Sequence, residues 1–429
     1  MTEIKGKRLL ILGSSRLCCE IVRKAKKMGA YVVVTDRYPI EEAPAKQIAD
    51  KSYDVSTTDI DAMEKLIYDE GIDGVLTGFT DSTLPYYAEI CSRVNLPCYG
   101  TLEQFNLFIN KKKYKNLCKL FNVPVVEEYD INNNSNDSDY ECIKYPVLVK
   151  PVDSSAARGI SICNNKEELK EAYNHAMKFS QSKDIIVERY IKGKEVTIFW
   201  LFNDGEIRCT SIGNRHIKHN QEGVIALPVG YTFPSIFINK YQEEMINNAT
   251  NMFRSVGIKN GMMFMQCLVE NDECIIYDIG YRLTGSLEYI LLEDLCGYNP
   301  LEMMIQFALS GKMYKQKPYI NPLHSRYGFN ITFLVKPGII GEIHGLDKVR
   351  SIHGVLDAVE AHVEGDEIPV SSKGTLDQVV LRVFGTADTK DELVRIMNEV
   401  HSIFRVYDSD GNNMLLDVLD TNEVKAVMI

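Results

Sequence analysis

Several features that define other protein classes are missing from this chain of 429 residues. No apolar run is long enough to span a membrane, and no signal-peptide cleavage pattern follows the short apolar stretch in MTEIKGKRLLILG. A surplus of positive charge is also missing, because the net charge is −11. An acidic balance argues against nucleic-acid and anionic-membrane partners. We therefore expect a cytoplasmic protein without a membrane partner.

The eleven cysteines do not form the pattern of a disulfide framework or a zinc site. Their number is odd, Cys18 and Cys19 are adjacent, and no CxxC pair or Cys/His cluster occurs. Cys267 lies within the apolar run MMFMQCLV, where a free thiol behaves as a small hydrophobic side chain. These observations favour a reducing compartment.

The common glycine-rich nucleotide motifs are also absent. Gly13 is followed by Ser14, Ser15 and Arg16, which does not match the GxGxxG spacing of a dinucleotide-binding turn. Asp36, at the end of the second predicted strand, therefore gives only a superficial likeness to that fold. The GxxxxGK[ST] motif does not occur either. Any nucleotide must be bound by a different kind of site.

The remaining pattern predicts a multidomain protein of mixed α/β and α+β class. The length corresponds to roughly two or three domains. Residues 1–110 alternate strand-like and helix-like segments, which predicts a parallel sheet with helices on both faces. Residues 111–320 form a second predicted domain, which becomes rich in strands from about residue 145, and residues 321–429 form a third, α+β domain.

Gln266 and Asp278 are the most informative local pair. The turn residues Asn271, Asp272 and Glu273 separate two apolar runs, so we expect a hairpin. Folding it about Asp272 places Gln266 opposite Asp278, and opposed Cβ atoms lie about 5 Å apart. Two oxygen donors that converge in this way suit Mg²⁺. The alternative is an ordinary edge hairpin whose polar residues contact water.

Lys150 ends another apolar strand, and Pro151 keeps the chain extended there. The following segment, VDSSAARG, consists mostly of small residues, whose backbone N–H groups can approach phosphate oxygens. A lysine at this position offers a compact positive charge to a phosphate. The alternative is a strand-end lysine whose ammonium extends into water.

Two glutamates flank the next turn. Glu188 closes the strand DIIVE, and Glu195 opens EVTIFW after a turn at Lys192–Gly193. Two strands joined by such a linker can present backbone groups to an adenine edge and leave a carboxylate for ribose hydroxyls. The simpler alternative is a pair of exposed glutamates beside a turn.

The order of these features resembles the ATP-grasp superfamily. Lys111 is followed in turn by YPVLVKP, by a loop ending in Arg158–Gly159, by VERYIKGKEVT and by FMQ…YDIGYR. The likeness is to the branch that holds biotin carboxylase, the carbamoyl-phosphate synthetase large subunit, glycinamide ribonucleotide synthetase and bacterial L-amino acid ligases. It implies an N-terminal pre-ATP-grasp domain, a central ATP-grasp domain with a mobile lid at about 145–205, and a C-terminal α+β domain.

The resemblance also implies a role for each matching position. Lys150 and Arg282 are the implied catalytic residues, since Lys150 matches a phosphate-contacting lysine and Arg282 matches an arginine that steadies the transferred phosphate or the acyl phosphate. Gln266 and Asp278 match the two metal ligands. The positions implied to bind the nucleotide are Lys111, Lys150, Ser154, Ser155, Arg158, Gly159, Glu188, Ile191 and Glu195. Within this set, Glu188 and Ile191 match the adenine hinge, and Glu195 matches the ribose-binding acid.

By resemblance, the chain is expected to be a cytoplasmic ATP-dependent carboxylate–amine ligase. Such an enzyme uses ATP with Mg²⁺, or Mn²⁺ in its place, forms an acyl phosphate, and releases ADP and phosphate. Its partners would be small-molecule carboxylate and amine substrates, and a homodimer is one assembly to expect. Two alternatives stay open: a non-amine acceptor (hydroxyl, thiol or bicarbonate), and a nucleotide-binding regulatory protein with weakened catalysis. Gly280 stands where the family commonly has an Asn ligand, so the number of metal ions, one or two, also stays open.

Overall fold

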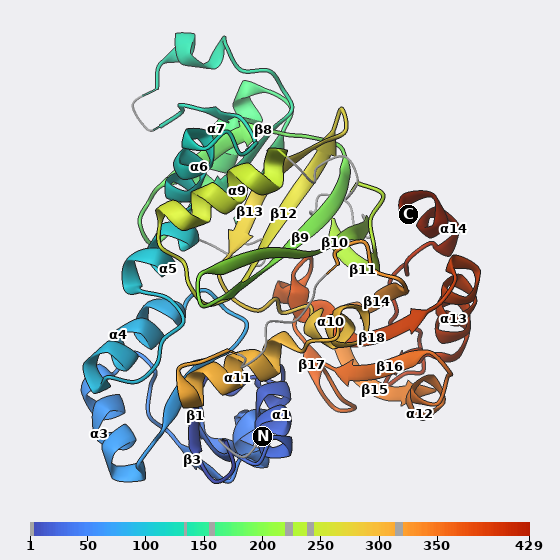
Figure 1. Cartoon of the computed structure of the whole chain (residues 1–429). Coiled ribbons are helices and arrows are strands. Elements are labelled where there is room, and N and C mark those ends of the chain that lie inside the picture. The colour runs from blue at the N-terminus through green and yellow to red at the C-terminus, as the bar shows by residue number, and fades with distance from the viewer. Residues whose placement is uncertain (1–3, 133–134, 154–158, 219–225, 238–243, 314–320) are drawn as a thin grey trace.

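The computed structural model describes residues 4–132, 135–153, 159–218, 226–237, 244–313 and 321–429. Figure 1 shows an N-terminal unit at the bottom, a small sheet at the top, and a large sheet that runs between them toward the C-terminal unit at the right. The large sheet therefore connects all parts of the molecule.

Four parallel strands form the N-terminal sheet, in the order β3-β2-β1-β4. The strands are β1 (Arg8–Leu12), β2 (Tyr31–Thr35), β3 (Lys51–Tyr53) and β4 (Gly74–Thr77). The helices between and after them are α1 (Cys18–Lys27), α2 (Pro44–Ile48), α3 (Ile60–Glu70) and α4 (Leu84–Val94). Leu10 pairs with Val33 on one side and Val75 on the other, and all three are buried because helices cover both faces. The predicted N-terminal parallel sheet is confirmed.

A helix from much later in the chain completes this unit. α11 (Pro300–Ser310) contacts β4, β1 and α1. Gly74 lies so close to α11 that a Cβ at this position would fall 2.1 Å from the carbonyl oxygen of Ala308. Lys24 of α1 and Glu302 of α11 form a salt bridge of 3.0 Å. The N-terminal unit thus includes a segment far beyond the predicted limit at residue 110.

The predicted lid segment at about 145–205 divides between two sheets. The small antiparallel sheet has the order β5-β8-β6-β7. Its strands are β5 (Glu128–Tyr129), β6 (Val147–Pro151), β7 (Ser161–Cys163) and β8 (Ile185–Arg189). α7 (Lys166–Ala176) packs against β6 and β7 and buries Leu169 in a separate small core. The next strand, β9 (Lys194–Asn203), belongs to the large sheet, so the small sheet ends before residue 194.

Eight strands form the large sheet, in the order β13-β12-β9-β10-β11-β14-β18-β16. Besides β9 they are β10 (Glu206–Lys218), β11 (Leu227–Phe233), β12 (Gly261–Glu270), β13 (Glu273–Gly280), β14 (Tyr327–Leu334), β16 (Val355–Glu360) and β18 (Val379–Ala387). β11 pairs with β14, for example at Tyr231 and Asn330. The sheet therefore continues across the predicted boundary at residue 320, and residues 321–429 extend the central unit.

The remaining elements surround these three sheets. A three-stranded sheet contains β15 (Gly338–His344), β17 (Glu367–Ile368) and β19 (Arg405–Asp408). The other helices are α5 (Leu102–Ile109), α6 (Lys111–Leu120), α9 (Glu244–Ser255), α10 (Tyr289–Cys296), α12 (Leu346–Arg350), α13 (Lys390–Ile403) and α14 (Thr421–Val424). Within the described ranges, no helix has both the length and the apolar composition required to cross a bilayer.

The β12–β13 hairpin turns at Asn271 and Asp272, which both have left-handed backbone angles, φ 50° and 65°. Two such residues fit a two-residue hairpin turn. That turn alone would set Gln266 opposite Tyr277, but the register shifts between Gln266 and Cys267, and Gln266 pairs with Asp278. The predicted Gln266–Asp278 pairing is confirmed, although it arises from a shorter turn combined with a β-bulge.

An aromatic cluster joins the N-terminal unit to the large sheet. Tyr281 is buried, and its ring centroid lies 5.3 Å from the rings of both Tyr99 and Phe105. Its hydroxyl lies 2.8 Å from the carbonyl oxygen of Tyr99 and 2.5 Å from that of Asn260. Buried carbonyl groups require a donor, so this hydroxyl fixes the residue that precedes Arg282.

We expect Tyr281→Phe to lower the free energy of unfolding by about 1–3 kcal/mol, because it leaves buried carbonyl oxygens without their donor. Tyr68→Phe is the matched control, since Tyr68 is 64% exposed. Urea unfolding of both variants tests the expectation. Equal stability of the two variants would show that the Tyr281 hydroxyl does not join the units.

Candidate nucleotide and acyl-transfer site

Three buried charges and one half-buried charge lie where β5, β6, β8 and α6 meet. The Nζ atom of Lys150 lies 2.5 Å from one carboxylate oxygen of Glu188, and the Nζ atom of Lys115 lies 2.5 Å from the other. Lys115 is also 2.9 Å from a carboxylate oxygen of Glu128. The side chains of Lys150 and Glu188 are 5% and 4% exposed, so the alternative of a lysine extending into water is wrong. Two lysines and two carboxylates together balance their charge.

Burial and the neighbouring charges act against each other on the pKa of each group, and the outcome differs among the members of this cluster. Burial acts to raise the pKa of Glu188, but Lys150 and Lys115 outweigh it and lower that pKa below its usual value. Burial lowers the pKa of Lys150 against the opposing effect of Glu188. For Lys115 the two carboxylates outweigh burial and raise the pKa. Lys115 thus contacts two carboxylates, whereas Lys150 contacts one, Glu188.

Lys115 was not predicted from the sequence. α6 begins after Asn110, whose side chain accepts a hydrogen bond from the backbone N–H of Lys113 at 3.1 Å. The helix buries Tyr114, Lys115 and Cys118. Lys115 shares the inward face of α6 with Tyr114 and Cys118. This position in the helical pattern could have indicated from the sequence that the lysine is buried.

Lys111, at the start of α6, also faces this region. Its Nζ atom lies 3.5 Å from the carbonyl oxygen of Val152, directly after β6. Gly159 has a left-handed backbone, φ +72°, and a Cβ there would lie 3.0 Å from Phe179 and from Pro151. The predicted loop residues between these points, Ser154, Ser155 and Arg158, lie outside the described residues.

A small apolar cluster joins Ile191, in the predicted adenine hinge, to the β12–β13 hairpin. Ile191 is 4% exposed and packs with buried Val126 and Ile275. Leu268 and Tyr277 are partly exposed members of the same cluster. An apolar surface beside buried polar groups is typical of a site for a flat aromatic ring.

Asp278 stands opposite Gln266 at the end of the hairpin, and both are half-buried. Desolvation raises the pKa of Asp278, and the positive charges of Lys111, Lys150 and Arg282 oppose that effect. All three predicted cationic residues therefore lie within electrostatic reach of one carboxylate. Among the described residues, no cluster of three or more His, Cys, Asp and Glu side chains could hold a metal ion.

Arg282 is held by a residue from the N-terminal unit. Its Nε and Nη2 atoms lie 2.7 and 2.8 Å from the two carboxylate oxygens of Asp81, which follows β4. A paired contact of this kind fixes the plane of the guanidinium. The Arg282 guanidinium carbon also lies 5.1 Å from the centroid of the Phe264 ring. Asp81 and Phe264 were not predicted as site residues, because both contacts depend on tertiary structure.

Gly280 pairs directly with Phe264 in the β12–β13 ladder. A Cβ at position 280 would lie 2.3 Å from a ring carbon of Phe264. An Asn side chain cannot fit there unless the ring moves. Gly280 and Phe264 therefore form a complementary pair that also supports Arg282.

Glu195, the predicted ribose acid, is paired with an arginine. Arg215 of β10 contacts its carboxylate, and the hydroxyl of Tyr277 donates to the same group at 2.9 Å. Burial acts against the charge of Arg215, but Glu195 outweighs it and raises the pKa of the guanidinium. Arg215 was not predicted, and its position directly opposite Glu195 could have been found only from the strand register.

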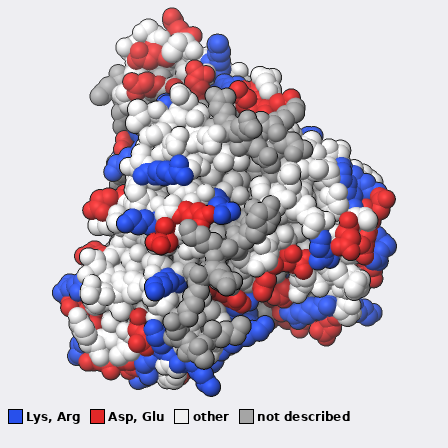
Figure 2. All heavy atoms as spheres, viewed as in Figure 1, with Lys and Arg blue, Asp and Glu red and all other residues white. Residues whose placement is uncertain are grey.

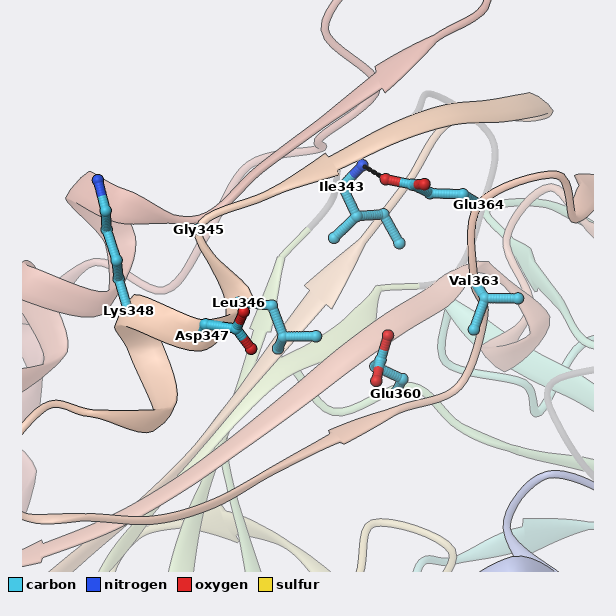
Figure 3. Close-up of a pocket in the computed structure, with 8 residues that line it drawn as sticks. All are labelled: Ile343, Gly345, Leu346, Asp347, Lys348, Glu360, Val363 and Glu364. Carbon is cyan, nitrogen blue, oxygen red and sulfur yellow. Dashed lines mark hydrogen bonds between the residues drawn. The ribbon is translucent and has the colours of Figure 1, made fainter.

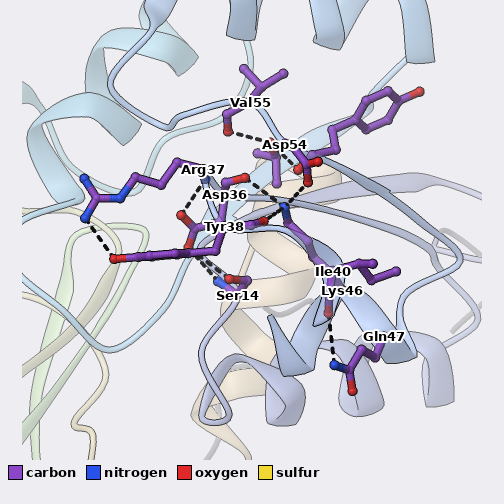
Figure 4. Close-up of polar contacts among 11 residues, drawn as sticks. Ser14, Asp36, Arg37, Tyr38, Ile40, Lys46, Gln47, Asp54 and Val55 are labelled. Atoms are coloured by element: carbon purple, nitrogen blue, oxygen red, sulfur yellow. Dashed lines mark hydrogen bonds and ion pairs between the residues drawn. The ribbon is translucent and has the colours of Figure 1, made fainter. Parts of the chain in front are cut away.

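The first turn of the N-terminal sheet is closed by the chain's own groups (Figure 4). The Asp36 carboxylate accepts hydrogen bonds from the backbone N–H and the hydroxyl of Ser14, at 3.1 and 3.0 Å. Lys46 is buried and donates to the carbonyl oxygen of Asp36 at 2.8 Å and to the Asp54 carboxylate at 2.6 Å. These contacts give Ser14 and Asp36 a structural role.

A hollow of about 530 Å³ lies elsewhere, in the C-terminal part of the chain (Figure 3). Its lining comes only from residues 343–364, and it includes the acidic residues Asp347, Glu360 and Glu364. None of the predicted site residues lines it. On the face shown in Figure 2, Lys and Arg side chains are interspersed with Asp and Glu.

Comparison with known proteins agrees with this geometry. Residues 143–287 match the family model described as ATP-grasp domain. A formate-dependent phosphoribosylglycinamide formyltransferase of Prochlorococcus marinus (strain NATL1A) is 30% identical over 215 residues, which are 48% of this chain and 54% of that protein. The chain spans about half the length of the curated relatives that it matches.

Solved structures extend the likeness over nearly the whole chain. Phosphoribosylglycinamide synthetase from Anaerococcus prevotii is similar with a TM-score of 0.73 and 21% identity, covering 94% of this chain and 100% of the other. L-amino acid ligase from Bacillus licheniformis gives a TM-score of 0.76 and 19% identity, covering 94% and 99%. Residues 143–287 thus match an ATP-grasp domain, which confirms the resemblance in the sequence, and nearly the whole chain shares the fold of these solved structures.

Replacing the buried lysine of α6 should destabilise the protein and weaken nucleotide binding. Lys115→Met leaves Glu188 and Glu128 without a shared counterion, and breaking a buried ion pair in this way costs about 3–5 kcal/mol. Chemical denaturation and ATP calorimetry measure the two effects. Lys119→Met, an exposed lysine one turn later on the same helix, is the control. If both variants unfold at the same denaturant concentration, Lys115 does not hold the cluster.

Gly280→Ala should lower stability by about 1–3 kcal/mol, because the new methyl group overlaps the Phe264 ring. Gly285→Ala is the control, since an added Cβ there has its nearest neighbour at 3.7 Å. The double variant Gly280→Ala/Phe264→Leu should be more stable than the sum of its single variants. Strictly additive thermal-melting results would contradict the proposed complementarity.

Proposed function

We propose that this chain is an ADP-forming ligase that phosphorylates a carboxylate with ATP and transfers the acyl group to an amine. The observation that carries the proposal is the gathering of Lys111, Lys150 and Arg282 around Asp278, opposite Gln266. Lys150 and Arg282 are held by ion pairs with Glu188 and Asp81, so these cations are fixed in position to meet the oxygens of a polyphosphate. Phosphoryl transfer depends mainly on such positioning and charge neutralisation.

The donor set also suits Mg²⁺, with Mn²⁺ as its usual replacement. Asp278 supplies one charged oxygen ligand and Gln266 a neutral one, and burial makes the Asp278 carboxylate dependent on a nearby cation. Mg²⁺ commonly takes one or two protein carboxylates and completes its shell with water and phosphate oxygens. When bound, the ion neutralises charge on the transferred phosphate. With Phe264 filling the space beside Gly280, we propose one protein-ligated ion.

The roles of the protein groups follow from their positions. Lys150 and Lys111 bind phosphate oxygens, and Arg282, held by Asp81, orients the oxygens of the transferred group. Ile191, together with Val126 and Ile275, supports the adenine ring, and Glu188 lies beside it as the counterion of Lys150. Glu195 accepts from ribose hydroxyls while Arg215 fixes its carboxylate.

An acyl phosphate reacts readily with water, so the site must exclude water until the amine attacks. The small sheet of β5 to β8 carries Lys150 and Glu188, and the Nζ atom of Lys150 donates to the carbonyl oxygen of Tyr277 in the hairpin at 3.3 Å. We assign it the role of the lid. The amine nitrogen then attacks the acyl carbon, the carbon–oxygen bond to phosphate breaks, and the amine loses one proton.

The comparisons support the ligase class without identifying the substrates. Phosphoribosylglycinamide synthetase and L-amino acid ligase share the fold with this chain. A non-amine acceptor remains the second candidate, because a biotin carboxylase domain dimer has the same fold with a TM-score of 0.76. Assembly as a homodimer and small-molecule substrates are part of the same proposal. So are the domain limits 1–110, 111–320 and 321–429, as divisions of the chain that α11 and the large sheet cross.

Phosphate release from ATP, screened over pairs of carboxylic acids and amines, tests the proposal. Asp278→Asn should lower that release roughly tenfold or more at low Mg²⁺ and recover partly at high Mg²⁺, because the lost charge weakens metal affinity. Gln266→Glu should shift the Mg²⁺ dependence to lower concentrations, since it adds a charged ligand.

Normal turnover of Asp278→Asn at every Mg²⁺ concentration would refute the metal assignment. Tight ATP binding by the wild type without phosphate release for any acid and amine would instead favour a regulatory nucleotide-binding protein.

A further inference from the structure

A row of polar side chains continues across the large sheet from Glu195. Glu195 lies opposite Arg215, Arg215 opposite Tyr231, and Tyr231 opposite Asn330. Directly opposed residues of antiparallel strands share a face, so all four lie on one side of the sheet. Gln266 lies on that side too, because Leu268 is opposite Glu195 and two residues from Gln266. The row therefore begins at the proposed nucleotide site and extends across the large sheet away from that site.

Arg382 of β18 ends this row. It lies opposite Thr332, two residues after Asn330, and its Nη1 atom donates to the Thr332 hydroxyl at 2.7 Å. Arg382 is 5% exposed. Within the described part of the chain, no carboxylate lies within 4 Å of its guanidinium. A buried guanidinium without a carboxylate is costly, and burial lowers its pKa accordingly.

Two acceptor atoms nearby lack a hydrogen-bond donor. Glu288 is fully buried; one carboxylate oxygen accepts from the Thr284 hydroxyl, and the other, Oε1, has no hydrogen-bond partner. Asn330 donates through Nδ2 to the carbonyl oxygen of Ser286 at 2.8 Å, and its Oδ1 atom also has no partner. Buried acceptors normally have donors, so each of these two oxygens retains the capacity to accept a hydrogen bond from an N–H or O–H group of a ligand.

Tyr231 shows that these groups form one cluster. Its hydroxyl accepts a hydrogen bond from Nε of Arg215 at 3.1 Å. Burial raises the pKa of Tyr231, Arg215 and Arg382 lower it, and Glu288 raises it further. Tyr231 therefore lies within electrostatic reach of both arginines and of Glu288.

The cluster also lies beside the acyl-transfer position. The segment Thr284–Ser286 follows Arg282 by two to four residues, and it is half-buried, whereas Glu288 is fully buried. Ser286 contacts the cluster through its carbonyl oxygen, and Thr284 contacts it through its hydroxyl. A molecule bound to the cluster would thus be adjacent to the guanidinium that orients the transferred phosphate.

We propose that Arg382, Glu288 and Asn330 form a binding subsite for the zwitterionic head of an α-amino acid, one substrate of the ligase reaction. The carboxylate pairs with the guanidinium of Arg382, and the ammonium donates to Oε1 of Glu288 and Oδ1 of Asn330. A single molecule thereby satisfies the cation and both acceptors. This inference rests on the proposed function and names its substrate class.

Charge balance favours a zwitterion over an anion. Arg215 and Arg382 carry two positive charges, and Glu195 and Glu288 carry two negative charges. An amino acid leaves that balance unchanged, whereas a phosphate group would add close to two negative charges at neutral pH. A dianion would also face the unpartnered oxygen of Glu288, which repels it.

The decisive measurement is calorimetric binding of L-alanine, propionate and ethylamine to the full chain with Mg²⁺ and a non-hydrolysable ATP analogue. L-alanine carries both charged groups, and each of the other probes carries one. We expect L-alanine to bind about tenfold or more tighter than either, because each charged contact contributes about that factor. Equal binding of the three probes, or none, overturns the subsite.

Variants then test separately the residue proposed to bind the carboxylate and the residue proposed to bind the ammonium. Arg382→Gln and Glu288→Gln should each weaken L-alanine binding about tenfold or more while the affinity for the ATP analogue stays within about twofold. Arg395→Gln, an exposed arginine of α13, is the control. If Arg382→Gln does not fold, Glu288→Gln decides alone, because it keeps the shape of the side chain and removes its charge.

Phosphate release separates this inference from the proposed function. Release with acid and amine pairs that exclude amino acids, without L-alanine binding, would overturn the subsite and leave the ligase proposal intact. L-alanine binding that both variants weaken, without any phosphate release, would support the subsite and remove the ligase proposal. Unchanged L-alanine binding in both variants would show that ordered water satisfies these polar atoms.

Discussion

The pairing of β12 with β13 is the constraint on which the candidate site depends. Strand side chains alternate between two faces, so a shift of one residue would move Asp278 away from Gln266. The bulge at Tyr277 prevents this, because it adds one residue to β13 just before Asp278. The same pairing sets Gly280 against Phe264 and leads β13 to Arg282. The proposed metal ligands and the proposed phosphate-binding arginine are thus placed by one hairpin.

Charge compensation is the second organising feature. Lys115 and Lys150 balance Glu188 and Glu128 in the small sheet, and Arg282 balances Asp81 beside the large sheet. Partly satisfied charges remain at Lys150 and Asp278, where the nucleotide and its metal are proposed to bind. The incompletely neutralised charges therefore lie where a bound nucleotide and metal ion could neutralise them.

Much of the fold could be predicted from the sequence, because the period of the apolar residues distinguishes an amphipathic helix from a strand. The N-terminal sheet, α6 and the β12–β13 hairpin follow directly from such patterns. The continuous sheet across residue 320 could not be predicted, since β11 and β14 are nearly a hundred residues apart in sequence. Asp81 and Lys115 were missed because their partners Arg282 and Glu188 lie 201 and 73 residues away along the chain. Arg215 was missed because only the strand register places it opposite Glu195.

The return of α11 to the N-terminal sheet has a consequence for synthesis on the ribosome. At Gly74, β4 packs against residues close to Ala308, which are made much later. At typical rates of about 5–20 residues per second, translation from residue 110 to residue 310 takes roughly 10–40 s. During that interval the nascent N-terminal unit carries an apolar face without its covering helix. The first part of the chain to emerge is therefore among the last to be completed.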